Sequence, residues 1–125
     1  MQEIYEYLET CDNVVIASPI YFSELTGKLL DLGSRLQTYF CGRKIRKEEE
    51  HRKSKKGAVL LVGGGDGNPH KAYETACTLL HHMNCCQIHE LVCCRGTNER
   101  AARDDARAVD GVRSIAAYLQ RITLK

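Results

Sequence analysis

The sequence predicts an α/β fold, with a parallel sheet covered by helices on both faces. Short apolar runs rich in β-branched residues alternate with amphipathic helical patterns. The order is helix, strand, helix, strand, helix, strand, helix. A length of 125 residues with 43% hydrophobic and 27% charged residues favours one soluble globular domain spanning 1–125. We expect right-handed crossovers between the parallel strands.

The chain opens with a predicted helix over 2–10, in which Ile4 and Leu8 share one face. A strand over 14–17 follows. Its sequence, Val-Val-Ile-Ala, is continuously apolar, as in a strand buried on both faces of a parallel sheet. Ser18 and Pro19 end this run.

A long helix is predicted over about 24–40, a solvated charged loop over 43–56 and a second strand over 58–62. Gly42 is a plausible stop for the helix. The apolar stripe of this helix consists of Leu25, Leu29, Leu32, Leu36 and Phe40.

After the glycine-rich stretch 63–69, a helix over 70–84 and a strand over 88–94 are predicted. Asn98 is the predicted cap of a final helix over 99–122. The predicted inner face of that helix consists of Val109, Val112, Ala116 and Leu119.

Two loops follow strands and therefore lie where open parallel sheets bind their ligands, outside the carboxyl ends of the strands. They are the turn 18–22 and the glycine loop 63–67. Tyr21 and Phe22 could flank a planar ligand, or they could simply cover the end of the sheet. The glycine loop could bring backbone amides close to a ligand, or it could be a plain connection. It matches neither a Walker loop nor a complete dinucleotide fingerprint.

The seven cysteines indicate reduced thiols that serve as small apolar residues in a cytoplasmic protein. Their number is odd, two pairs are adjacent, and no CxxC motif is present. Cys77, His81 and Cys85 share a helical face and could form a soft-metal or redox cluster. Because no fourth ligand is evident, we predict no metal site.

Charge and motifs exclude several functions. A formal net charge of +2, and acidic residues within the basic loop 43–56, argue against nucleic acid as a partner. That loop could instead contact phosphates of NAD(P)H or an acidic partner, or serve only for solubility. No apolar run reaches the roughly 18 residues of a membrane span. No Ser-His-Asp set or paired carboxylates stand out, so we assign no catalytic residue.

The stretch Ala17-Ser18-Pro19-Ile20-Tyr21-Phe22, followed by Leu25-Thr26-Gly27-Lys28-Leu29, resembles NAD(P)H-dependent FMN reductases and iron–sulfur flavoproteins. The resemblance implies a flavodoxin-like three-layer sandwich, FMN as cofactor, NAD(P)H as electron donor and a small-molecule acceptor such as a quinone or flavin. Residues implied to contact the cofactor are Ser18, Pro19, Ile20, Tyr21, Phe22, Gly63, Gly64, Gly65, Asp66 and Gly67.

The chain also departs from that family. After the glycine loop only Glu74 corresponds to the family pattern, and no phosphate-binding loop stands before Met1. We therefore expect a partial domain that holds strands three to five of the order 2-1-3-4-5, lacks the first two strands and binds flavin poorly. The exposed edge of strand 14–17 implies a homo-oligomer such as a homodimer. The alternative is a non-catalytic flavodoxin-like remnant or oligomerisation module.

Overall fold

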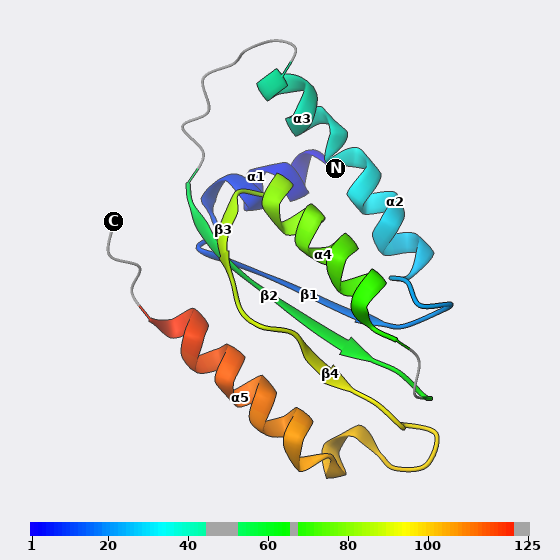
Figure 1. Cartoon of the computed structure of the whole chain (residues 1–125). Helices are drawn as coiled ribbons and strands as arrows, with labels where there is room; N and C mark the ends of the chain where they lie inside the picture. Colours follow the sequence, from blue (N-terminus) through cyan, green and yellow to red (C-terminus); the bar gives the residue numbers. More distant parts are fainter. Residues whose placement is uncertain (45–52, 66–67, 122–125) are drawn as a thin grey trace.

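The computed structural model describes residues 1–44, 53–65 and 68–121 (Figure 1). Its elements follow the predicted alternation. In chain order they are α1 (Gln2–Thr10), β1 (Asn13–Pro19), α2 (Gly27–Arg35), α3 (Gln37–Lys44), β2 (Lys55–Val62), α4 (His70–His82), β3 (Cys85–Ile88), β4 (Val92–Cys94), the 3-10 helix η1 (Ala102–Asp104) and α5 (Ala106–Gln120).

The sheet is parallel throughout, with β1 at one edge and β2 in the middle. β1 pairs with β2 along its full length, from Asn13 opposite Lys56 to Pro19 opposite Val62. β3 and β4 follow one another along the other side of β2. The prediction of a parallel α/β sheet is confirmed.

The two faces of the sheet carry cores of different size. One face packs against α2 and α4 around Val59, Leu61 and Leu80, all fully buried. Of the described helices, only α5 packs against the opposite face (Figure 1). Its core is small and consists of Ala58, Val92 and Ile115, with Leu60 and Leu119 packed against it.

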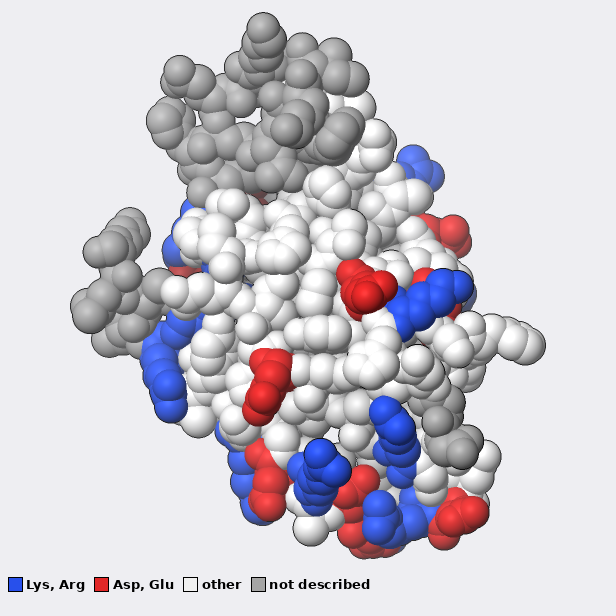
Figure 2. All heavy atoms as spheres, in the orientation of Figure 1, with Lys and Arg blue, Asp and Glu red and all other residues white. Residues whose placement is uncertain are grey.

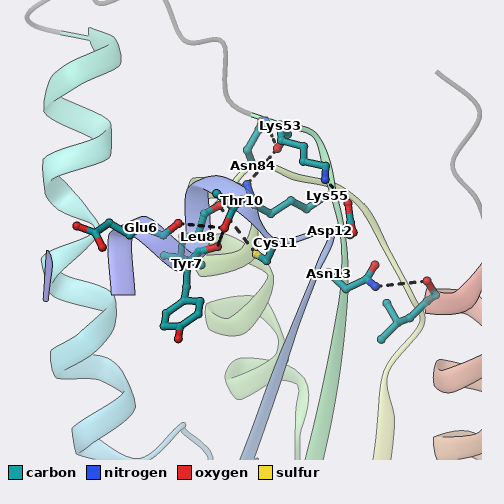
Figure 3. A network of polar contacts seen from close by, with 11 residues as sticks. Glu6, Tyr7, Leu8, Thr10, Cys11, Asp12, Asn13, Lys53, Lys55 and Asn84 are labelled. Atoms are coloured by element: carbon teal, nitrogen blue, oxygen red, sulfur yellow. Dashed lines mark hydrogen bonds and ion pairs between the residues drawn. The ribbon is translucent and has the colours of Figure 1, made fainter. Parts of the chain in front are cut away.

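Polar contacts tie the elements together at the amino ends of the strands (Figure 3). Lys53 forms an ion pair with Asp12, and its carbonyl accepts hydrogen bonds from Lys55 Nζ at 3.0 Å and from Asn84 Nδ2 at 3.0 Å. Asn13 Nδ2 donates to the carbonyl of Leu119 at 3.4 Å. The starts of β1, β2 and β3 and the end of α5 are therefore linked.

The predicted loop 43–56 is wrong at both of its ends. α3 extends to Lys44, and β2 begins at Lys55, so Lys55 and Lys56 are buried strand residues. Lys56 Nζ donates to the carbonyls of Tyr118, at 3.2 Å, and Arg121, and lies 5.2 Å from the centroid of the Tyr118 ring. This ammonium group caps the carboxyl end of α5. Residues 45–52 lie outside the described residues.

The predicted helix 24–40 is divided into two helices. Leu25 lies before α2 in the structure, and Thr26 is the N-cap, its Oγ1 accepting from the N–H of Leu29 at 3.4 Å. α2 ends at Arg35, where the N–H of Leu36 bonds to the carbonyl of Gly33 in a tighter turn. Leu25 and Leu36 are still buried, as the predicted stripe requires.

The predicted strand 88–94 is two short strands interrupted at residues 89–91. β3 starts as early as Cys85 because Asn84 turns the chain sharply after α4. Asn84 has φ 63°, a left-handed conformation that asparagine adopts readily at the end of a helix. The helix predicted over 70–84 accordingly ends at His82.

The predicted start of the final helix is also wrong. α5 begins at Ala106, and Asp105 is its N-cap, with Oδ1 accepting from the N–H of Ala108 at 3.2 Å. Asn98 does not cap a helix. It lies in a loop whose Gly96 has φ 72°, followed by η1. The last residue of the prediction, 122, lies outside the described residues.

The buried face of α5 differs from the predicted one. Ala108 and Ile115 are buried, and Gly111 faces Val92. Val112 and Ala116 are exposed instead. Ser114 and Tyr118 contact His89 on the β3 side of α5. Val112 and Ala116 lie on the opposite flank of this helix, which faces β1. Of the predicted stripe, Val109 and Leu119 are half-buried, with Leu119 against the core, and Val112 and Ala116 are left uncovered.

None of the described helices combines the length and the apolar character needed to cross a membrane.

Candidate functional site

Three loops meet at the carboxyl ends of the strands, at the lower right of Figure 1. They follow β1 (residues 20–26), β2 (63–69) and β4 (95–101). The first two contain most of the residues predicted to contact a cofactor, and the other two, Ser18 and Pro19, are the last residues of β1. Asp66 and Gly67 of that set lie outside the described residues.

The first loop contains a tight two-residue turn with aromatic side chains at its tip. Tyr21 and Glu24 exchange two backbone hydrogen bonds, each of 3.0 Å. Between them, Phe22 has φ 50° and Ser23 has φ 62°, the left-handed pair that this kind of hairpin turn requires. Glycine or asparagine normally occupies such positions, so a phenylalanine here strains the backbone. Phe22 is fully exposed and Tyr21 is 60% exposed.

The base of this turn is held firmly by polar contacts. Ser18 is buried, and its Oγ donates to the carbonyl of Pro19 at 2.7 Å and accepts from the N–H of Thr26 at 3.3 Å. Glu24 Oε2 accepts from Thr75 Oγ1 of α4 at 3.0 Å. The turn is therefore a supported structure that presents Tyr21 and Phe22 to solvent.

The second loop is joined to its neighbours through backbone groups. The N–H of Gly63 donates to the carbonyl of Cys94 at 2.8 Å. Its carbonyl accepts from Thr97 at 3.2 Å, and that of Gly64 accepts from Asn98 at 3.3 Å. On the other side, Ile20 Cδ1 lies 3.6 Å from the position that a Cβ on Gly63 would occupy. The predicted turn and glycine loop are thus adjacent.

Two of the three described glycines in this loop have different surroundings. A Cβ on Gly64 would lie 2.5 Å from Asn98 Oδ1, so the Asn98 side chain already covers this residue. A Cβ on Gly65 would have no atom within 4 Å. Gly65 therefore offers open backbone to a ligand, whereas the packing of Asn98 accounts for the glycine at 64.

The third loop was not assigned to the site from the sequence. Thr97 and Asn98 hold the glycine loop in place, and the Gly96-Thr97-Asn98 turn signal directly after a strand could have revealed them. Burial raises the pKa of the neighbouring Cys94 thiol, and its Sγ contacts Asp105 Oδ2 at 3.5 Å. The Ala108 N–H lowers the pKa of Asp105, and Arg100 reinforces the effect from 3.2 Å.

Charge is distributed unevenly over the surface shown in Figure 2. Charged side chains of both signs gather along its lower edge, where the loop after β4 leads into α5. The middle of this view is largely uncharged. The turn exposes the Tyr21 and Phe22 rings, its charged residue Glu24 is engaged with Thr75, and the open backbone of Gly65 lies in the adjacent loop. Exposed rings beside open backbone are suited to a flat ring.

A separate hollow of about 970 Å³ lies between β4 and α5. Its wall includes His89, Arg95, Arg107 and Ser114. Of the described residues predicted to contact a cofactor, none lines it. Acidic and basic groups both line it, including Glu90, Asp104 and Asp105.

The possible Cys/His cluster receives no support from the geometry. Cys85 is buried in the core beside Leu80, whereas His81 is exposed. Within the described ranges, no three His, Cys, Asp or Glu residues are placed to hold a metal ion.

Comparison with known proteins identifies likenesses in structure alone. No family model matches the chain, and no curated protein sequence matches it. A flavone reductase superposes on 94% of this chain, with a TM-score of 0.66 and 20% identity. An azoreductase from Bacillus anthracis str. Sterne (97% covered, TM-score 0.57, 16% identity) and an NADPH-quinone reductase from P. pentosaceus (98%, 0.54, 12%) are also similar.

These likenesses confirm the flavodoxin-like α/β fold. The chain spans 46% of the flavone reductase, 63% of the azoreductase and 75% of the quinone reductase. The chain therefore corresponds to only part of each of these structures.

Proposed function

We propose that this chain forms part of an NAD(P)H-dependent oxidoreductase of the flavin or quinone reductase type, with FMN as its cofactor. The strained, well-anchored turn that exposes Tyr21 and Phe22 beside Gly65 carries the proposal. Strained backbone is often retained where a ligand is bound. The reductase names of the structural neighbours support the same chemistry.

In this proposal each group has a limited role. When bound, FMN supplies hydride acceptance and release, and the protein supplies placement. Tyr21 and Phe22 flank the flavin ring, and the backbone of Ile20 and Gly65 borders it. Ser18 keeps the turn in position through its two hydrogen bonds. NAD(P)H is the proposed electron donor, and a small molecule such as a quinone is the acceptor.

We expect FMN binding by this chain to be weak, because these loops provide ring contacts and no assigned site for the phosphate. The odd cysteine count with two adjacent pairs supports a cytoplasmic location.

The sharpest test separates the aromatic ring of Phe22 from the strain at its backbone. Phe22→Gly and Ser23→Gly both place glycine at a left-handed position, so each should stabilise the fold by about 1 kcal/mol. Only Phe22→Gly removes a ring, and it should weaken FMN binding about tenfold. Quenching of flavin fluorescence during titration measures the affinity, and thermal denaturation measures stability.

Equal FMN affinity of the two variants would overturn the role of Phe22. No saturable binding by the unmodified chain at high micromolar FMN would overturn the cofactor proposal for this chain. That outcome would favour the second candidate, a non-catalytic oligomerisation module. The observation in favour of this candidate is that β1 is an edge strand among the described residues, with Val15 47% exposed.

A further inference from the structure

His89 lies in a bulge between β3 and β4, on the side of the sheet away from β1. Ile88 is opposite Gly57, and Val92 is opposite Leu60, so the outer chain has one residue more than β2 over this stretch. The His89 N–H still donates to the Gly57 carbonyl at 2.9 Å. Bulges of this kind re-aim side chains and are common beside active sites. Here the bulge directs the His89 ring towards α5.

Three contacts orient the His89 ring. Its Nδ1 lies 2.7 Å from the carbonyl oxygen of Glu90, its Nε2 lies 3.0 Å from Ser114 Oγ, and Tyr118 packs edge to face at 5.3 Å between centroids. Because a carbonyl oxygen can only accept a hydrogen bond, Nδ1 carries the proton. In the neutral ring Nε2 therefore accepts from the Ser114 hydroxyl. This is the arrangement of a nucleophile, its general base and a third group that orients the base.

The hydroxyl of Ser114 differs from other hydroxyls on the helices. Ser34, Thr75 and Thr78 each donate to the carbonyl of a residue three or four positions earlier, the usual partner of such a side chain. Ser114 forms no such bond with a described residue, and its Oγ is directed to a histidine 25 positions away in sequence. The orientation of this hydroxyl is therefore set by His89.

Both residues line the hollow of about 970 Å³ between β4 and α5, so a ligand can reach the hydroxyl. Ser114 is exposed and His89 is half-buried. Three arginines and three acidic residues balance in the lining, and Leu91 and Val92 add apolar wall, which suits an uncharged ligand. The backbone N–H groups of Glu90 and Leu91, in the bulge, donate to no described backbone group. They are available to an oxygen atom of the ligand.

We propose that Ser114 and His89 form a nucleophile–base pair that hydrolyses uncharged carboxylic esters bound in this hollow. Ser114 Oγ attacks the ester carbonyl carbon while His89 Nε2 accepts the hydroxyl proton. The bond from that carbon to the alkoxy oxygen breaks, and the alkoxy group leaves as an alcohol with the proton from His89. Water, losing a proton to the same nitrogen, then releases the carboxylic acid from the acylated serine and restores its hydroxyl.

Reaction of the full chain with diisopropyl fluorophosphate tests the pair, independently of any flavin. The reagent phosphorylates an activated serine with release of fluoride, and mass spectrometry of peptides identifies the residue. Ser114 should react about 100-fold faster than Ser34, an exposed serine of α2 that donates to a backbone carbonyl. His89→Gln should slow the labelling of Ser114 about 100-fold, with an intact fold by circular dichroism. His81→Gln, at an exposed histidine of α4, is the matched control and should leave the rate unchanged.

Turnover of p-nitrophenyl acetate provides the second readout. After the accessible thiols are blocked with iodoacetamide, Ser114→Ala should abolish turnover, and Ser34→Ala should leave it unchanged. Equal labelling of Ser114 and Ser34 in the unmodified chain would overturn the proposal, and so would labelling of Ser114 that does not depend on His89. Ester turnover that survives Ser114→Ala would overturn it as well.

Discussion

The two faces of the sheet are stabilised by different kinds of contact. The face under α2 and α4 buries aliphatic side chains such as Val59, Leu61 and Leu80. The face under α5 has few apolar contacts, and α5 is held at its ends by Asp105 and by Lys56. A helix on a small core thus depends on its caps, whereas a helix on a large core depends on packing.

The largest expected effect is on the larger core. Leu80→Ala should lower the free energy of unfolding by about 4 kcal/mol, because the fully buried leucine leaves a cavity. Ile115→Ala, in the smaller core, should cost about 2 kcal/mol. Urea denaturation followed by circular dichroism measures both. Equal losses would contradict the difference between the faces.

The next largest loss of stability is expected at the cap on the carboxyl end of α5. Lys56→Met keeps an apolar stem but leaves the carbonyls of Tyr118 and Arg121 without their donor. We expect a loss of about 2 kcal/mol in the same urea assay. Lys28→Met, at an exposed position of α2, is the control and should change little. An unchanged stability of Lys56→Met would show that α5 is held by packing after all.

A smaller effect is expected at Gly111, where α5 approaches β4 closely. A Cβ on Gly111 would lie 2.7 Å from Val92 Cγ1, whereas one on Gly27 would meet nothing within 4 Å. Gly111→Ala should therefore lose about 1 kcal/mol despite the better helix propensity of alanine. Gly27→Ala should be neutral. Adding Val92→Ala to Gly111→Ala should recover part of the loss, and failure to do so would point to another cause.

Thiol reactivity tests how tightly the face under α2 and α4 is closed, because Cys85 belongs to its core. Burial raises the pKa of Cys85 to about 11, with Lys55 opposing the shift, so at pH 7 its thiolate fraction is about 100-fold below that of an ordinary cysteine. Exposed Cys86 should react first with iodoacetamide, as mass spectrometry of digested samples would show. Early labelling of Cys85 would indicate that its face opens readily.

The raised pKa of Cys85 also makes the stability of the fold depend on pH. The folded state disfavours the Cys85 thiolate, so this group leaves stability intact below about pH 9. Its contribution is then lost as the pH rises from about 9 towards about 11. Cys85→Ala should flatten the fall in stability over this range.

Local patterns predicted the elements whose signals lie within a few residues. The apolar run of β1 and the four-residue spacing in α1 gave those elements with nearly correct bounds. The sequence placed Lys55 and Lys56 in a loop, because the partner that allows Lys56 to be buried is a helix end 62 residues away. Asn98 looked like a helix cap, but its side chain is used across the loop against Gly64.

The positions of two loops of the candidate site were predicted, but their geometry was not. The rule that ligands bind at the carboxyl ends of parallel strands located both the turn and the glycine loop. The left-handed turn could not be foreseen, because Phe22 and Ser23 are residue types that seldom adopt it. The cofactor roles of residues 18–22 and 63–67 remain predictions.

The contacts that hold α5 also bear on the order in which the molecule folds. Asn13 and Leu119 lie 106 residues apart in sequence, and Lys56 and Tyr118 lie 62 apart. Closing such long loops is entropically costly, whereas β1 and β2 pair over a much shorter separation. Docking of α5 is therefore expected to be the last folding step, and amide protons on α5 should be the last to become protected in a pulse-labelled refolding experiment.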